Sequence, residues 1–327
     1  MNHRLLAALA VLVTVMVLLA AHVSAQGPAK AYVPQKTADG QPDLQGVWSN
    51  STTVPLERPA NLGAKEFYTE EEYAAIQQRA AARAGQGKQT TPGTVADVHY
   101  DLSQFGLDRR EAAKNLRTSL IIGPEGKVPP LLPAAAKRQQ DRAAYQRVHG
   151  FDGPENRGIA ERCILWGNEG PPMLSPGYNS VLQIVQGAGY VAIMQEMIHD
   201  VRIIPIDNRP HLDSNLHQWF GDARGHWEGN TLVVETTNFT DKTAFRGSSE
   251  KLRVVERFTR ADPETIRYEF TVSDPSTWEK SWSAEVLWTK SASNTLYEYA
   301  CQEANYGMAN ILSGVRATEK EEAEKKK

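Results

Sequence analysis

The sequence lacks an excess of charge of either sign. Among its 327 residues, 36 lysines and arginines nearly balance 39 aspartates and glutamates, so the formal net charge is −3. Acidic and basic residues are also interspersed along the chain. Binding to nucleic acid usually needs a basic face that neutralises phosphates. We therefore expect no nucleic-acid partner.

Several motifs that mark well-known enzyme classes are missing as well. The sequence contains no Gly-x-Gly-x-x-Gly, no phosphate-binding P-loop, no Cys-x-x-Cys, no His-Glu-x-x-His and no Gly-x-Ser-x-Gly. These motifs hold nucleotides, zinc or an activated serine. Their absence argues against nucleotide-dependent enzymes, zinc proteases of that type and the usual serine hydrolases. We expect no organic cofactor.

Long apolar runs occur at one place only, the N-terminus. Arg4 precedes an apolar run of about 17 residues, and the small residues Val23-Ser24-Ala25 follow. This order is typical of a secretory signal peptide, here residues 1–25 with cleavage after Ala25. An uncleaved membrane anchor is the alternative. No other segment of the sequence is apolar enough to cross a bilayer, so we expect a periplasmic or secreted protein without a stable membrane span.

Cysteine is scarce, since Cys163 and Cys301 are the only two in the sequence. In a chain exported to an oxidising compartment, one disulfide bond between them is expected. Its role would be structural, because closing a long loop restricts the unfolded chain. The alternative is a pair of buried free thiols.

The mature chain is predicted to form one β-barrel domain over residues 43–315, after an extended arm at 26–42. A helical and loop insertion is expected at about 50–160, because the strand pattern is interrupted there. The last residues, 316–327, are almost all charged, and this composition predicts a disordered tail.

Two helices are predicted inside the insertion. Thr69 and Glu72 form a capping box ahead of an alanine-rich stretch, which predicts a helix of about four turns. Pro133 begins a second helical stretch, in the first turn, where proline is favoured.

A succession of short alternating runs extends from Gly189 to Glu303, each bounded by Gly, Asp, Asn or Pro. This pattern predicts an antiparallel meander, with residues 295–303 as its last strand. The residues at 151–188 are rich in glycine and proline and are expected to be mostly loop. A meander of this length must close or stack to hide its edges. The expected fold is mainly β, with the meander closed into a barrel, and a β-sandwich is the alternative.

Counting alternate residues along these runs places two glutamates on otherwise apolar faces. The faces are Tyr190, Ala192, Met194 and Glu196, and Leu252, Val254, Glu256 and Phe258. An unpaired buried carboxylate costs several kcal/mol. Each glutamate therefore either pairs with Arg202, Arg224 or Arg253, or lines a wet cavity. In a cavity its pKa would rise, which suits a general acid or base, so Glu196 and Glu256 are candidate catalytic residues.

Histidines gather in the same region, where His199, His211, His217 and His226 occur close together. Histidine transfers protons readily near neutral pH. His199 falls at the end of a predicted strand and His211 in a loop, where the mouth of a barrel is expected, so both are candidate catalytic residues. A surface or structural role is the alternative for each.

The same region offers a second chemistry, metal binding. His211, Asp213 and His217, together with Asp222, could supply three or four ligands to a divalent metal. Their spacing matches no standard motif, so a metal site is considered but not favoured.

Tryptophan is abundant, with seven residues, six of them in the C-terminal half. Such rings usually form core, but in a polar β-structure they can also stack against sugars or aromatic ligands. Arginines could hold an anionic group beside them. The candidate ligand-binding residues are Arg202, Arg224, Trp48, Trp219, Trp227, Tyr268 and Trp288.

The stretches PDLQGVW, MIHDVRIIPIDNRPHL and RGHWEGNTLVVETTNF resemble those of a large family of exported proteins of soil bacteria. The resemblance covers nearly all of the mature chain. It implies export and a single module, and it brings no catalytic residue. Gly46-Val47-Trp48 ahead of a meander also resembles the opening strand of lipocalin-like β-barrels, which implies an architecture and not a function.

We therefore expect an exported, cofactor-independent enzyme that performs acid–base chemistry on a small organic or carbohydrate ligand in a barrel cavity. Its reaction would be that of a lyase, hydratase, isomerase or hydrolase. The alternative is a non-catalytic, lipocalin-like protein that binds an apolar, aromatic or glycan ligand.

Overall fold

The computed structural model describes residues 32–84, 112–166, 170–243, 245–303 and 305–327. The expected signal peptide lies outside these residues, as does the beginning of the expected arm. Among the helices that the structure describes, none is long and apolar enough to cross a bilayer.

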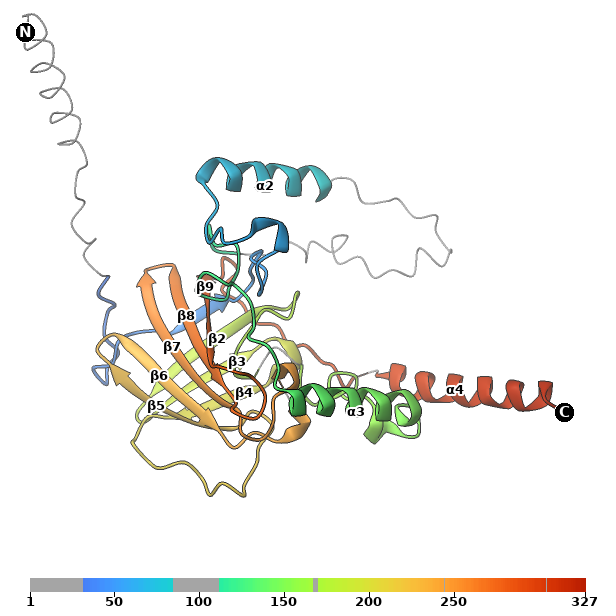
Figure 1. The fold of residues 1–327 in the computed structure, drawn as a ribbon. Coiled ribbons are helices and arrows are strands. Elements are labelled where there is room, and N and C mark those ends of the chain that lie inside the picture. The colour runs from blue at the N-terminus through green and yellow to red at the C-terminus, as the bar shows by residue number, and fades with distance from the viewer. Residues whose placement is uncertain (1–31, 85–111, 167–169, 244, 304) are drawn as a thin grey trace, which may run out of the picture. The chain divides into compact units, whose positions relative to one another are not determined.

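Nine strands form one antiparallel sheet (Figure 1). They are β1 Gly46–Ser49, β2 Val181–Gly187, β3 Tyr190–Gln195, β4 Val201–Pro205, β5 Asp222–Glu228, β6 Thr231–Thr237, β7 Arg253–Asp262, β8 Thr265–Ser273 and β9 Trp282–Lys290. Their order across the sheet is β4-β3-β2-β1-β9-β8-β7-β6-β5. Consecutive strands are neighbours except for β4 and β5, which lie at opposite ends of this order, and β1 also pairs with β9. The predicted mainly-β meander is confirmed.

Closure into a barrel is not confirmed, because β4 and β5 are the two edges of the sheet and no backbone ladder joins them among the described residues. The strands also form one sheet and not the two of a sandwich. The edges nevertheless come close, since a Cβ added to Gly225 of β5 would lie 2.9 Å from the Cγ2 atoms of both Ile204 and Ile206. We call β4, β5 and the residues 206–221 that connect them the seam.

The inward face of the sheet is a filled hydrophobic core. Tyr268 packs against Trp288 with ring centroids 4.8 Å apart and planes tilted by 33°, and Phe258 lies 5.0 Å from Tyr268 and 5.5 Å from Trp288. All three rings are fully buried, as is Trp48, whose indole N–H donates to the carbonyl of Leu44. Burying each such ring stabilises the fold by roughly 1.5–3 kcal/mol. The prediction that Trp48, Tyr268 and Trp288 bind a ligand is not supported by this placement, because they are core.

Glu256 is sealed into this core by an ion pair. Its carboxylate accepts from both terminal nitrogens of Arg202, at 3.0 and 2.6 Å, and from the hydroxyl of Tyr268 at 2.8 Å. The side chains of Glu256 and Arg202 are 0% and 3% exposed. Burial, followed by the charge of Glu256, raises the pKa of Tyr268 well above its usual value, so the hydroxyl remains a donor. Of the two roles expected for Glu256, the structure shows the arginine pair.

Alternate counting fails on β3. Val191 and Ile193 face the core, whereas Tyr190, Ala192 and Met194 face outward. Glu196 lies beyond the end of the strand, so it does not continue the face that the sequence predicted. In neighbouring β4, Ile204 is buried and Ile203 is exposed. Because both faces of such a strand carry apolar residues, counting alternate residues does not show which face points inward.

The helices begin as the sequence predicts. α2 spans Glu70–Ala84, and its capping box is formed, since the N–H of Thr69 donates to Glu72 and the N–H of Glu72 donates to the Thr69 hydroxyl. α3 spans Pro133–His149 with proline at its first position. The C-terminal stretch differs from the prediction, because Tyr306–Lys325 form α4. Its glutamates and lysines are good helix formers, a preference that overrides their charge.

One strand was missed and one predicted strand does not form. The described part of 151–188 is mostly loop, as expected, but it also contains β2, in which Leu182 and Ile184 are buried. The stretch 295–303, expected to be a strand, forms none, and Tyr297 is exposed. Alternation in that stretch does not produce a strand because no apolar face is buried.

The expected disulfide bond is confirmed. Cys163 and Cys301 are bonded, with Cα atoms 5.7 Å apart and 138 positions between them in the sequence. The bond joins the residues ahead of β2 to the segment that follows β9.

Replacing both cysteines with serine is expected to lower the free energy of unfolding by about 2–5 kcal/mol, because a long loop is no longer closed in the unfolded chain. Chemical denaturation of the oxidised wild type and of the double variant measures this difference. The reduced wild type should match the variant. An unchanged denaturation midpoint would show that the disulfide bond does not stabilise the part of the protein that unfolds cooperatively.

The buried pair gives a second test. Arg202→Met and Glu256→Gln are each expected to cost about 3–5 kcal/mol, because each leaves one buried charge without its partner. The double variant removes both charges and keeps an acceptor for Tyr268. It should be more stable than either single variant in chemical denaturation. If the free-energy costs of the two single variants simply added in the double variant, this result would contradict the pairing of Arg202 with Glu256.

Candidate functional site

An open cleft of about 640 Å3 runs along the seam. β4 forms one wall and the first residues of β5 form the other, and the connection between them contributes Arg209, Leu212 and Trp219. From β5, Asp222 and Arg224 line it. This cleft brings charged and apolar side chains together outside the sealed core.

The connection is held against the end of β6. The side-chain amide of Asn238 donates to the carbonyls of Leu212, Asp213 and Leu216. Gly221 then turns the chain into β5 with a φ of 70°, and a Cβ there would lie 2.5 Å from the carbonyl oxygen of Thr237. Only glycine can lie so close to the backbone of β6. The turn places the next residue, Asp222, against the connection.

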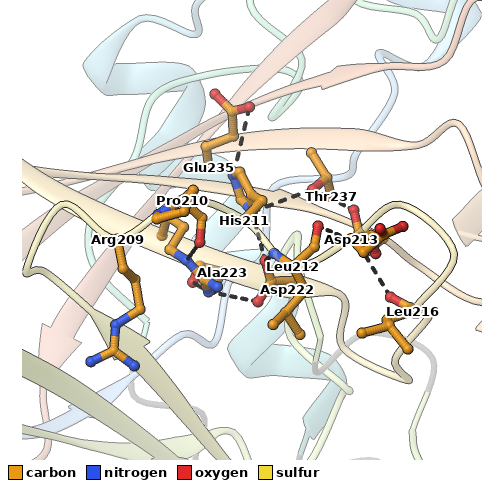
Figure 2. A network of polar contacts seen from close by, with 12 residues as sticks. Arg209, Pro210, His211, Leu212, Asp213, Leu216, Asp222, Ala223, Glu235 and Thr237 are labelled. Atoms are coloured by element: carbon orange, nitrogen blue, oxygen red, sulfur yellow. Dashed lines mark hydrogen bonds and ion pairs between the residues drawn. The ribbon is translucent and has the colours of Figure 1, made fainter.

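His211 bonds to Asp222 across the seam (Figure 2). Its Nδ1 lies 2.8 Å from Oδ2 of Asp222. The imidazole is 28% exposed and the aspartate 5%. Arg209 and Leu212, which precede and follow His211 in the chain, line the cleft, whereas His211 itself is not among the lining residues.

Asp222 is fixed by two further bonds. Its Oδ2 also accepts from the N–H of Leu212 at 2.9 Å, and its Oδ1 accepts from Arg224 at 2.6 Å. Arg224 in turn donates to the carbonyls of Pro210 and Ala223, at 2.8 and 2.7 Å. The network therefore orients the carboxylate before it meets the imidazole.

A second carboxylate lies on the other side of the ring. Oε1 of Glu235, on β6, is 3.9 Å from Nε2 of His211. The hydrogen bond from Arg253 lowers the pKa of Glu235 below its usual value, with smaller contributions from the charges of Arg253 and His211, so Glu235 is ionised near neutral pH. An imidazolium at His211 would lie between two carboxylates.

The arrangement suits general acid–base chemistry. An ionised carboxylate only accepts hydrogen bonds, so the bond to Asp222 requires the proton on Nδ1 of His211. The lone pair of the neutral ring is then on Nε2. A carboxylate that fixes the tautomer of a histidine base and stabilises its protonated form is a recurrent catalytic device.

Glu196 occupies a different place, the turn between β3 and β4 that includes the 3-10 helix η5, Met197–His199. It is buried and accepts from the amide of Asn179 at 3.0 Å. Burial raises its pKa, and the Asn179 bond opposes this only in part. No described arginine or lysine forms an ion pair with it.

The same turn carries two non-glycine residues in the left-handed region, Ile198 at φ 59° and His199 at φ 52°. Such residues cost roughly 1–3 kcal/mol each. His199 is exposed, and its Nδ1 lies 3.1 Å from the carbonyl of Tyr299. Among the described residues, neither Glu196 nor His199 bonds to His211, so the four predicted catalytic residues do not form one constellation.

Of the predicted ligand-binding residues, Arg202, Arg224 and Trp219 line the cleft. Trp227 instead packs, partly buried, against the core. His217 also lines the cleft, whereas Asp213 caps a local turn by accepting from the N–H of Asn215. Among the described residues, no group of three or more His, Cys, Asp or Glu side chains has the geometry of a metal site.

Sequence reasoning weighed Asp222 only as a metal ligand and missed Glu235 and Asn238. The outward positions of β5 and β6 supply Asp222 and Glu235, which are paired across strands with Thr237 and Arg224. Alternation identifies such residues as outward-facing, but it does not show that a loop folds back over them. Asn238 gives the only local signal, since an asparagine at the end of a strand often binds nearby backbone.

No protein-family model, curated protein or solved structure matches the chain.

The raised pKa of Glu196 has a consequence for stability. The folded state holds the proton more tightly than the unfolded state, so wild-type stability should fall as pH rises from about 4.3, the usual glutamate value, through the raised pKa. Glu196→Gln cannot ionise, and its advantage over the wild type should grow across that window and then level off. Denaturation at several pH values measures it. Glu250→Gln, at an exposed position before β7, is the matched control, and an equal pH profile for Glu196→Gln and wild type would contradict the burial argument.

Proposed function

We propose that the chain is an exported acid–base enzyme whose general base is His211, acting on a small organic molecule held in the seam cleft. Nε2 would take a proton from the substrate or from a water molecule that attacks it. The first case describes a lyase or isomerase, and the second a hydrolase. The expected barrel cavity is replaced in this proposal by the cleft.

The bond between His211 and Asp222 carries the proposal. It gives the imidazole a defined tautomer and orientation, and Glu235 lies on the other side of the ring. The cleft volume, about 640 Å3, falls within the range of small-molecule sites, roughly 300–1,000 Å3. The predicted signal peptide and the disulfide bond support export.

A non-catalytic binding protein is the second candidate. Trp219, Leu212 and Ile203 line the cleft and are exposed. Exposed apolar walls of this kind suit the capture of an apolar or aromatic molecule without chemistry.

A generic probe of a positioned base separates the two. 5-Nitrobenzisoxazole opens to a coloured phenolate when a base removes its ring proton, and its aromatic body suits the cleft. The wild type is expected to open it faster than the same concentration of free imidazole. His211→Gln should lose on the order of 10²-fold, the usual contribution of general acid–base catalysis.

His226→Gln is the matched control, because His226 also meets a carboxylate, Glu228, at 3.2 Å, but this carboxylate is 49% exposed, whereas the Asp222 partner of His211 is 5% exposed. Its rate should remain within about twofold of wild type. If the wild type does not accelerate the ring opening, the result would favour a binding protein. Equal losses of rate in the two variants would show that His211 is not the general base.

A further inference from the structure

Arg224 lines the cleft with a guanidinium that is only partly used. Its Nε donates to the carbonyl of Pro210, and its Nη1 donates to Asp222 and to the carbonyl of Ala223. Among the described residues, Nη2 has no hydrogen-bond partner. The side chain is 15% exposed. Three bonds therefore hold the guanidinium in place while one of its two terminal nitrogens remains available to a ligand.

Arg209 repeats this arrangement in the connection. Its Nε and Nη2 bind the carboxylate of Asp207, and Nη2 also donates to the hydroxyl of Tyr190 at 2.7 Å. Its Nη1 has no partner within the described part of the chain. Arg209 also lines the cleft. The cleft thus carries two fixed guanidiniums, each with an unused donor.

The acceptors beside the cleft are already occupied. Asp222 is the carboxylate among the lining residues, and its two oxygens accept from Arg224, His211 and the N–H of Leu212. Glu256, which binds Arg202, is sealed in the core. An anionic ligand would find open donors here, whereas a cationic one would have to displace existing bonds.

Apart from Arg202, His217 and Gln218, the remaining lining is apolar. Val201 and Ile203 project from the outer face of β4, and Leu212 and Trp219 project from the connection. Trp219 is 38% exposed, so much of its ring is free to cover a ligand. A molecule that fits must combine one planar anionic group with an apolar or aromatic body.

We infer that the cleft binds organic carboxylates with an apolar or aromatic body, the carboxylate on Arg209 and Arg224 and the body against Trp219. This substrate class rests on the proposed function, since it assumes that the cleft is where the substrate of His211 is held. A carboxylate matches the geometry because its two oxygens can each accept from one guanidinium.

Calorimetric titration with two probes of the same shape tests the inference. 2-Naphthoate carries the carboxylate, and 2-naphthamide replaces it with a neutral amide. The wild type is expected to bind naphthoate at least about tenfold more tightly, because hydrogen bonds to a charged group contribute about 1.5–3 kcal/mol. Arg209→Gln and Arg224→Gln should each reduce naphthoate affinity toward that of the amide and leave amide binding unchanged.

Arg257→Gln is the control, because Arg257 of β7 pairs with Glu228 of β5 and does not line the cleft. This variant should keep the preference for naphthoate over the amide. His211→Gln should also keep it within about twofold. A wild type that binds naphthoate but does not accelerate proton transfer would end the proposed function alone. The inference is overturned if neither probe binds, if the two bind equally, or if the preference survives both Arg209→Gln and Arg224→Gln in variants that retain the wild-type circular dichroism spectrum.

Discussion

The carboxylate of Asp222 joins the sheet to the long connection between its two edge strands. One oxygen accepts from Arg224, two residues along β5, and the other accepts from the imidazole and the backbone of the connection at His211 and Leu212. Without this carboxylate, the connection would lose its charged anchor on β5, and the imidazole would lose its defined orientation. The orientations of His211 and Arg224 both depend on it.

Polar residues have different roles in the interior of the sheet and at the seam. Inside, Glu256 and Arg202 neutralise one another beneath packed rings, an arrangement that is costly to break but has no route to a substrate. At the seam, the sheet leaves two edges without mutual backbone bonds. Side chains from β4, β5 and the connection cover these edges, and the cleft forms where the cover is incomplete. Exposed edges must be protected in some way, and here the protection also supplies the candidate site.

The sequence predicted the elements whose pattern is local. The capping box at Thr69, the proline start at Pro133 and the inward face of β7 depend on residues a few positions apart, and all are found. Predictions that depend on tertiary neighbours were less secure. Glu256 was correctly placed inward, but whether an arginine would meet it depended on β4, more than 50 positions away. The partner of His211 was equally hidden, because it depends on how one loop returns to the sheet.

The central claim is that Nε2 of His211 presents a lone pair while Asp222 holds the proton on Nδ1. Nitrogen-15 NMR of protein labelled at histidine, recorded at alkaline pH where the ring is neutral, measures this tautomer directly, and His211→Gln assigns the signal. The account predicts a protonated Nδ1 and a bare Nε2 in the wild type, and loss of that preference in Asp222→Asn. A wild-type ring that carries its proton on Nε2, or a tautomer unchanged in Asp222→Asn, would contradict it.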